Sequence, residues 1–92
     1  MADRKALERR VMEIVGRQYR KAPAFQPDRP ITASDRLRED LGFDSLALVV
    51  LQIELEDAFH IRFDPAAEDL QQIFTCTESL IESVQDHITA QT

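Results

Sequence analysis

Ser45 stands between Asp44 and Leu46, at the beginning of the most apolar run of the chain. A serine in this place has two common uses: its side chain can cap a helix, or a group can be attached covalently to its hydroxyl. Asp44 is an equally good capping residue and comes one position earlier, so a helix here does not need Ser45 as its cap. The hydroxyl of Ser45 is therefore available for attachment chemistry, and the surrounding sequence has to decide between the two uses.

Other residues that could do chemistry form weaker patterns. Ser45 with His60 or His87 and an aspartate could be called a catalytic triad, but the G-x-S-x-G turn and the strand that would present it are missing. Cys76 is the single cysteine, so neither an internal disulfide nor a cysteine-cluster metal site is expected. We interpret His60 as a residue at the end of a helix, His87 as solvent-facing and Cys76 as a small buried residue. We predict no catalytic residue and no metal ligand, so the chain is not expected to be an enzyme.

The composition is that of a small acidic domain. The chain has 92 residues and a net charge of −6, and we expect one domain over residues 1–92 with a modest core. Residues 1–21 contain seven Lys or Arg and three Asp or Glu, a balance of +4, whereas residues 22–92 contain four and fourteen, a balance of −10. An acidic domain repels nucleic acid phosphates, so partners with basic surfaces are favoured and nucleic acid is not expected.

No segment has the composition of a membrane span or of a secretory signal. No run approaches about 18 uninterrupted apolar residues, and the charged amino terminus MADRKALERR is not followed by an apolar run. We therefore expect a cytoplasmic protein without a membrane span. We also expect it to be a monomer.

The hydrophobic periodicity predicts an all-α fold, a small four-helix bundle with a long first loop and a short third helix. The first helix covers residues 3–21, with Asp3 as its N-cap and apolar residues every three or four positions. Gly16 interrupts this helix, which points to close packing or a softened last turn. Three prolines within residues 22–38 impose an extended loop. The side chains expected to pin this loop are Phe25, Ile31 and Leu37.

Three further helices are predicted after this loop. The second runs from near Asp44 to near Phe59, and the FHIRF segment after it reads as an extended loop. DPAAEDLQQIF opens with an aspartate followed by a proline, which predicts a short third helix capped by Asp64. TCTE matches a capping box, in which Thr75 accepts amide hydrogen bonds while Glu78 reaches back. The apolar stripe of the fourth helix is then made by Leu80, Ile81, Val84 and Ile88.

The second helix carries apolar residues on two sides. On a helical wheel, one side holds Leu48, Leu51, Leu55 and Phe59. The opposite side holds Leu46, Val49, Val50 and Ile53. The first stripe is sufficient to make a core face, so the helix is either buried on both sides or presents its second stripe to partners. With only three other helices, one of them short, we favour an interaction surface that makes brief, replaceable contacts.

The segment REDLGFDSL, residues 38–46, closely resembles the attachment motif of acyl carrier proteins. The order of the predicted elements also matches that family across nearly the whole chain. The resemblance implies that 4'-phosphopantetheine, donated by coenzyme A through a separate phosphopantetheinyl transferase, is esterified to Ser45 and carries acyl groups on its thiol. Acyl-loading and acyl-processing enzymes are then the further partners. Asp44 and Gly42 support the attachment site, Gly42 by making the approach flexible, and the helix start favours the anionic phosphodiester.

The outer side of the second helix departs from the common pattern of this family. Carrier proteins of bacterial fatty acid synthesis usually have acidic residues two and five positions after the serine, whereas this chain has Ala47 and Val50. We therefore predict a specialised carrier that serves a polyketide, modified-lipid or similar pathway. The predicted partner-binding face consists of Leu46, Val49, Val50, Ile53, Glu54 and Asp57.

Two alternatives remain open at the level of the sequence. Within the same family, the chain could be an aminoacyl or peptidyl carrier, which only its cargo or its partners would distinguish. Outside it, the chain could be a helical interaction domain with an unmodified Ser45, in which the second stripe is a docking groove or a dimer face.

Overall fold

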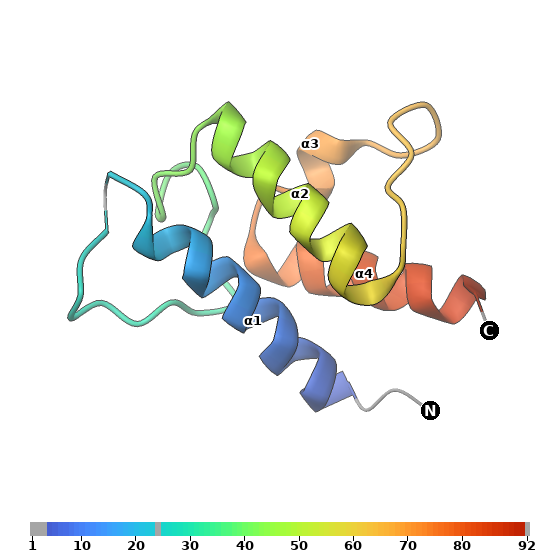
Figure 1. The fold of residues 1–92 in the computed structure, drawn as a ribbon, viewed down its shortest axis with the longest axis horizontal. Helices are drawn as coiled ribbons and strands as arrows, with labels where there is room; N and C mark the ends of the chain where they lie inside the picture. The colour runs from blue at the N-terminus through green and yellow to red at the C-terminus, as the bar shows by residue number, and fades with distance from the viewer. Residues whose placement is uncertain (1–3, 24, 92) are drawn as a thin grey trace.

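The computed structural model describes residues 4–23 and 25–91, and in them it forms four helices and no strand. The helices are α1 (Arg4–Arg20), α2 (Ser45–Phe59), α3 (Leu70–Ile73) and α4 (Thr77–Gln91). In Figure 1, α1 and α2 lie side by side and run in opposite directions, and α4 contacts both of them. The all-α fold with a long first loop and a short third helix is confirmed. Asp3, the predicted cap of the first helix, lies outside the described residues.

The core forms where α1, α2, α4 and the first loop meet. The predicted stripe of α1 is buried, as are Leu80, Ile81 and Val84 of the predicted α4 stripe, whereas Ile88 is partly buried. Leu51 and Leu55 supply the fully buried part of α2. Gly16 is not required by packing, because a Cβ there would lie 3.7 Å from Cδ1 of Ile31, an ordinary van der Waals distance. The expectation of close packing at Gly16 is therefore wrong.

The long loop between α1 and α2 is ordered by specific contacts. The hydroxyl of Tyr19 accepts a hydrogen bond from the amide of Gln26 at 3.0 Å. Arg29 and Asp35 form an ion pair with an N–O distance of 2.7 Å. Leu37 is fully buried, whereas Phe25 and Ile31 are partly buried against the core. The three side chains that were predicted to pin the loop therefore do contact the core.

The start of α4 differs from the predicted capping box. Thr75 does not cap the helix, because its hydroxyl donates to the carbonyl of Gln71 at 2.8 Å. Cys76 takes the capping place instead: its amide donates to Ser79 Oγ at 3.2 Å, and its sulfur accepts from the amide of Ser79 at 3.5 Å. The next amides of α4 donate to carbonyls of the first loop, and Glu78 donates to Ala33 O at 2.7 Å. Tertiary contacts thus satisfy amides that the sequence assigns to local side chains.

The third helix also begins later than predicted. Asp69, not Asp64, is its N-cap and accepts from the amide of Gln72 at 3.3 Å. Asp64 instead begins a turn in which its own amide donates to Glu68 Oε2 at 2.7 Å. The other carboxylate oxygen of Glu68 lies 2.6 Å from His87 Nε2. The interpretation of His87 as solvent-facing is therefore wrong, because its side chain is only 21% exposed and extends from α4 toward this turn.

Candidate functional site

The backbone of the motif before α2 is held in place because the two residues that flank Gly42 are buried. Leu41 and Phe43 are buried in the core, and the amide of Phe43 donates to the carbonyl of Leu37 at 2.9 Å. Gly42 between them has φ 74°, a left-handed conformation that residues with a side chain rarely adopt. The glycine therefore makes one defined turn, and this differs from the flexibility that the sequence suggested.

Asp44 caps α2, which leaves the side chain of Ser45 unused by the helix. Asp44 Oδ1 accepts a hydrogen bond from the amide of Ala47 at 2.8 Å, and its carbonyl accepts from the amide of Leu48 at 3.0 Å. Ser45 is the first residue of α2 and is exposed. A hydroxyl in this place is accessible to a modifying enzyme without any change in the cap. Attachment at Ser45 stays a prediction.

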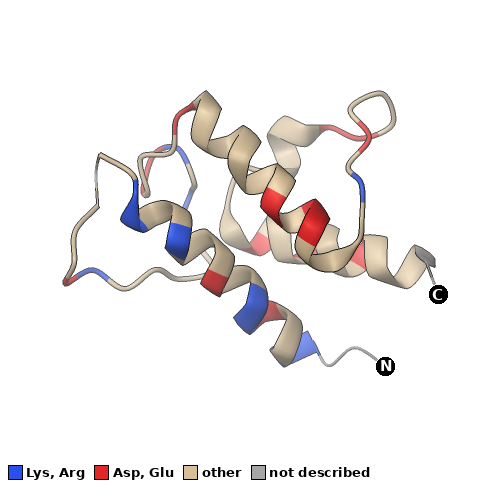
Figure 2. Ribbon diagram, viewed as in Figure 1, with Lys and Arg blue, Asp and Glu red and all other residues tan. Residues whose placement is uncertain are grey.

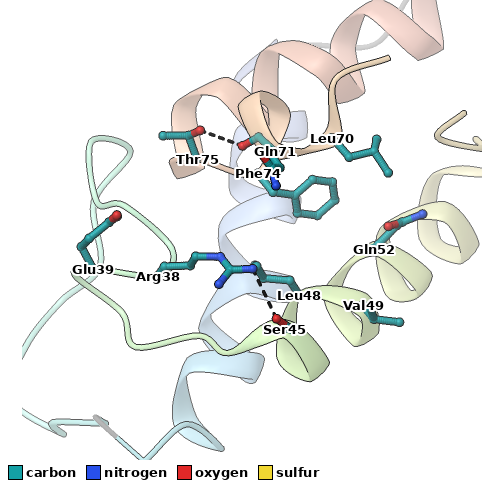
Figure 3. A pocket seen from close by; sticks show the side chains of 10 residues that line it. All are labelled: Arg38, Glu39, Ser45, Leu48, Val49, Gln52, Leu70, Gln71, Phe74 and Thr75. Carbon is teal, nitrogen blue, oxygen red and sulfur yellow. Dashed lines mark hydrogen bonds between the residues drawn. The ribbon is translucent and has the colours of Figure 1, made fainter. Parts of the chain in front are cut away.

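A groove opens beside Ser45 between α2 and α3. It has a volume of about 540 Å³ and lies between the first half of α2 and residues 70–75 (Figure 3). Its residues are Arg38, Glu39, Ser45, Leu48, Val49, Gln52, Leu70, Gln71, Phe74 and Thr75. The end near Ser45 is charged, whereas Leu48, Leu70 and Phe74 give the rest of the groove an apolar surface. A pocket of this size and mixed lining is typical of small-molecule sites in proteins.

Two of the three arginines in the first loop are bound by carboxylates. Hydrogen bonding to Asp35 raises the pKa of Arg29, and hydrogen bonding to Asp40 raises the pKa of Arg36. In return, the backbone amide and then the guanidinium of Arg36 lower the pKa of Asp40. Arg38 differs, because its Nη2 donates to Ser45 Oγ at 3.4 Å (Figure 3). Arg38 is the first residue of the REDLGFDSL motif, and no pattern in the sequence predicts a role for its side chain.

The second stripe of α2 is exposed over three of its four residues. Leu46, Val49 and Ile53 have exposed fractions of 72%, 51% and 58%. Val50 differs: it is half-buried and lines a small groove with Gln18, Lys21 and other residues, among them Leu46. The helix is therefore not buried on both sides, and Val50 lies at the edge of the exposed stripe, in a groove near the end of α1.

Of the three acidic residues of α2, Glu56 accepts a hydrogen bond from the amide of Phe63 at 2.9 Å, whereas Glu54 and Asp57 lie on the side of α1. Figure 2 shows them on the second half of α2, beside the basic residues of α1. Glu54 Oε1 accepts a hydrogen bond from Gln18 Nε2 at 2.8 Å, so this predicted partner-binding residue is engaged within the molecule. Asp57 is exposed and lines the same groove as Arg10, Arg17 and other basic residues of α1.

The histidines do not lie in the groove beside Ser45. His60 ends α2 in a left-handed conformation with φ 55°, and its amide donates to the carbonyl of Glu56. His87 lies against Phe63, with ring centroids 5.1 Å apart. Over residues 4–23 and 25–91, no three His, Cys, Asp or Glu side chains gather as a metal site would require. In the same ranges, no helix has both the length and the apolar character to cross a bilayer.

The fold and the site together define a class: a small helical domain that presents a serine beside a groove, at the start of its second helix. The family model described as "Phosphopantetheine attachment site" matches residues 9–84. This match covers most of the chain, so the protein belongs to the family of phosphopantetheine-dependent carrier proteins. Its members carry the attachment site of 4'-phosphopantetheine and interact with modifying and processing enzymes. No curated protein matches the chain.

Proposed function

We propose that this protein is an acyl carrier, itself not an enzyme, whose 4'-phosphopantetheine arm is attached to Ser45. The observation that carries this proposal is the exposed hydroxyl of Ser45 at a groove, with the capping of α2 left to Asp44. Attachment would bond the hydroxyl oxygen to the phosphorus that bears pantetheine. The bond from that phosphorus to the bridging oxygen of coenzyme A would break, and the nucleotide part and the hydroxyl proton would leave.

The residues around Ser45 fit an anionic arm. The first turn of α2 contains no acidic residue, and Arg38 donates to the hydroxyl itself. Free amides at a helix start and an arginine both favour a phosphate group. The arm supplies a terminal thiol that holds cargo as a thioester. The chain's own residues would orient the phosphate end, and the apolar part of the groove would receive what the thiol carries.

The lining of the groove supports an acyl cargo over an aminoacyl or peptidyl one. Leu48, Leu70 and Phe74 offer apolar contact, and a charged ammonium group placed against these three side chains would lose solvation that they cannot replace. An alkyl chain gains about 0.8 kcal/mol for each methylene that it removes from water. We therefore expect a medium-length acyl thioester to raise the melting temperature of the arm-bearing protein more than an aminoacyl thioester does. Equal shifts for the two cargoes would contradict the acyl assignment.

The exposed stripe supports a specialised pathway. Leu46, Val49 and Ile53 are apolar and open, so a partner that binds there is expected to use apolar contact and shape before charge. This surface is continuous with the attachment site, because Val49 also lines the groove beside Ser45. A polyketide or modified-lipid pathway remains the proposed setting, and the protein is proposed to act as a monomeric single domain.

The test of attachment is the intact mass after incubation with coenzyme A and a phosphopantetheinyl transferase. The wild type is expected to gain one phosphopantetheine, Ser45→Ala none, and Ser34→Ala one, because Ser34 is an exposed serine of the first loop. A wild type that gains no mass would favour an unmodified interaction domain. Mass gain in Ser45→Ala would place the arm on another residue.

A further inference from the structure

Arg38 is the one arginine of the first loop that its neighbours leave without a carboxylate partner. Arg29 is bound by Asp35 at 2.7 Å, and Arg36 is bound by Asp40 at 3.3 Å. Among the described residues no ion pair involves Arg38, and its guanidinium is exposed. Within residues 4–23 and 25–91, the one hydrogen bond of its side chain runs from Nη2 to Ser45 Oγ at 3.4 Å. The positive charge of Arg38 is therefore directed at the candidate attachment atom.

We propose that Arg38 is a positioning residue that binds the phosphodiester of the attached arm and directs the arm into the groove between α2 and α3. This inference rests on the proposed function, since it requires the arm on Ser45. Arg38 and Ser45 line the same groove, and Figure 3 shows the guanidinium extending across its mouth toward the hydroxyl. Once Ser45 Oγ is esterified, the charged phosphate oxygens are only one atom further from Oγ. A guanidinium within 3.4 Å of Oγ is then within reach of these oxygens.

The chemistry of the side chain suits this role. A guanidinium keeps its charge at every physiological pH, and its planar set of donors matches the oxygens of a phosphate. A lysine would carry the same charge on a single ammonium group, without this planar set of donors. The structure holds Arg38 in place through its backbone, because its carbonyl accepts from the amide of Gly42 at 3.2 Å. The turn at Gly42 thus fixes the backbone position from which the side chain of Arg38 extends.

The surrounding charge gives the arginine an electrostatic task. Residues 22–92 carry four basic and fourteen acidic residues. Two of the acidic residues lie near Ser45: Asp44 precedes it in the chain, and Glu39 lines the same groove. A further negative group at Ser45 is repelled by these carboxylates. Arg38 offsets that repulsion at the point where the new charge arrives, and it biases the arm toward the groove rather than toward Asp44.

The test is a thermodynamic cycle that compares unfolding before and after attachment in wild type and in Arg38→Ala. In each protein, attachment changes the unfolding equilibrium constant by a certain ratio. In Arg38→Ala this ratio is expected to be less favourable to the folded state than in wild type by a factor of about 1.5 to 5, which corresponds to the free energy of an exposed ion pair. Effects of the substitution on the unmodified fold cancel in this cycle. The factor should fall toward one at about 1 M sodium chloride, because salt screens exposed charges.

Arg36→Ala is the matched control. It also removes one arginine, two residues before Arg38, but the guanidinium of Arg36 is bound by Asp40 and does not contact Ser45. Its factor is expected to be close to one, and Arg38→Lys is expected to keep part of the wild-type effect. Equal factors for Arg36→Ala and Arg38→Ala would show general electrostatics and overturn a specific role. A factor of one in Arg38→Ala would overturn it as well.

The ³¹P relaxation of the arm-bearing protein is a second readout, which is independent of stability. The phosphorus should move more freely in Arg38→Ala than in wild type or Arg36→Ala, and more freely in wild type at high salt. Mobility that is unchanged in all of them would contradict the proposal. If wild type gains no arm at all, the proposed function fails, whereas a wild type that is modified but shows neither effect overturns only the role of Arg38.

Discussion

The two apolar stripes of α2 have similar sequences and opposite surroundings. On the inner side, Leu51 and Leu55 are fully buried against the other helices. On the outer side, Leu46, Val49 and Ile53 are exposed by half or more. Hydrophobicity alone would bury both sides, so the exposed outer stripe does not contribute to the core, and we propose that it serves partners instead.

The position of the outer stripe indicates that purpose. It begins next to Ser45 and includes Val49, which also lines the groove between α2 and α3. The acidic half of α2 lies further along the helix, beside the basic helix α1 (Figure 2), and Glu54 and Asp57 line a groove with basic residues of α1. The two stripes therefore divide the helix between holding the fold together and presenting the candidate site, and substitutions can separate these roles.

The largest expected difference is between Leu55→Ala and Ile53→Ala, two neighbouring truncations on opposite stripes. Leu55→Ala should lower the free energy of unfolding by about 2–5 kcal/mol, because it leaves a cavity in a closely packed core. Ile53→Ala should change it by no more than about 0.5 kcal/mol, since an exposed side chain loses few contacts. Urea unfolding of both variants gives the comparison. Similar losses would mean that the outer stripe is packed in solution.

Val50→Glu and Val49→Glu test the boundary between the stripes. Val50 is half-buried against the end of α1, so a charge there should cost about 1–3 kcal/mol of stability. Val49 is 51% exposed, so the same substitution should leave stability within about 0.5 kcal/mol of wild type. Thermal or urea unfolding measures both.

The same pair also tests the proposed docking surface. Val49→Glu should still receive the arm from the transferase, while acyl loading by a cognate enzyme should fall. A Val49→Glu protein that is loaded as well as wild type would show that the outer stripe is exposed but unused. In that case the argument for a specialised carrier would lose its main support.

Asp44→Ala and Ser45→Ala separate the cap from the attachment residue at the start of the outer stripe. Asp44→Ala removes the acceptor for the amide of Ala47 and should cost about 0.5–2 kcal/mol. Ser45→Ala should leave stability nearly unchanged while abolishing attachment. Urea unfolding and intact mass measure the two effects. A larger stability loss in Ser45→Ala than in Asp44→Ala would reverse the assignment.

Asp57→Asn is expected to have the smallest effect and tests the far end of α2. Asp57 shares a groove with Arg10, Arg17 and other basic residues of α1, so removing its charge should lower stability by at most about 1 kcal/mol at low salt. The difference should disappear near 1 M sodium chloride, where the Debye length is about 3 Å. A stability that rises in Asp57→Asn would show that repulsion among the acidic residues outweighs the attraction of α1.

Several features of the fold follow from short sequence patterns. The spacing of apolar residues predicts the helices, because a helix repeats every 3.6 residues whatever lies around it. Pro23, Pro27 and Pro30 predict an extended loop in the same local way. The predicted cap of the fourth helix at Thr75 is wrong because amides there find acceptors elsewhere, and the predicted cap of the third helix at Asp64 is wrong because Asp64 belongs to a separate turn and Asp69 caps the helix. A capping motif competes with every carbonyl that the fold brings close, and in α4 carbonyls of the first loop satisfied two of the amides.

The sequence by itself determined the four helices, the long loop, the resemblance of residues 38–46 to an attachment motif and the presence of two apolar stripes on α2. These depend on periodicity and on neighbours in the chain, which the sequence displays directly. Only the tertiary structure decided which stripe is buried, that Val50 lies half-buried in a groove near the end of α1, and that the ring of His87 packs against Phe63 and the turn that holds Glu68. It also decided that Arg38 is directed at Ser45 while Arg36 is held by Asp40. Each of these depends on which distant segments come together, and a local pattern carries no information about that.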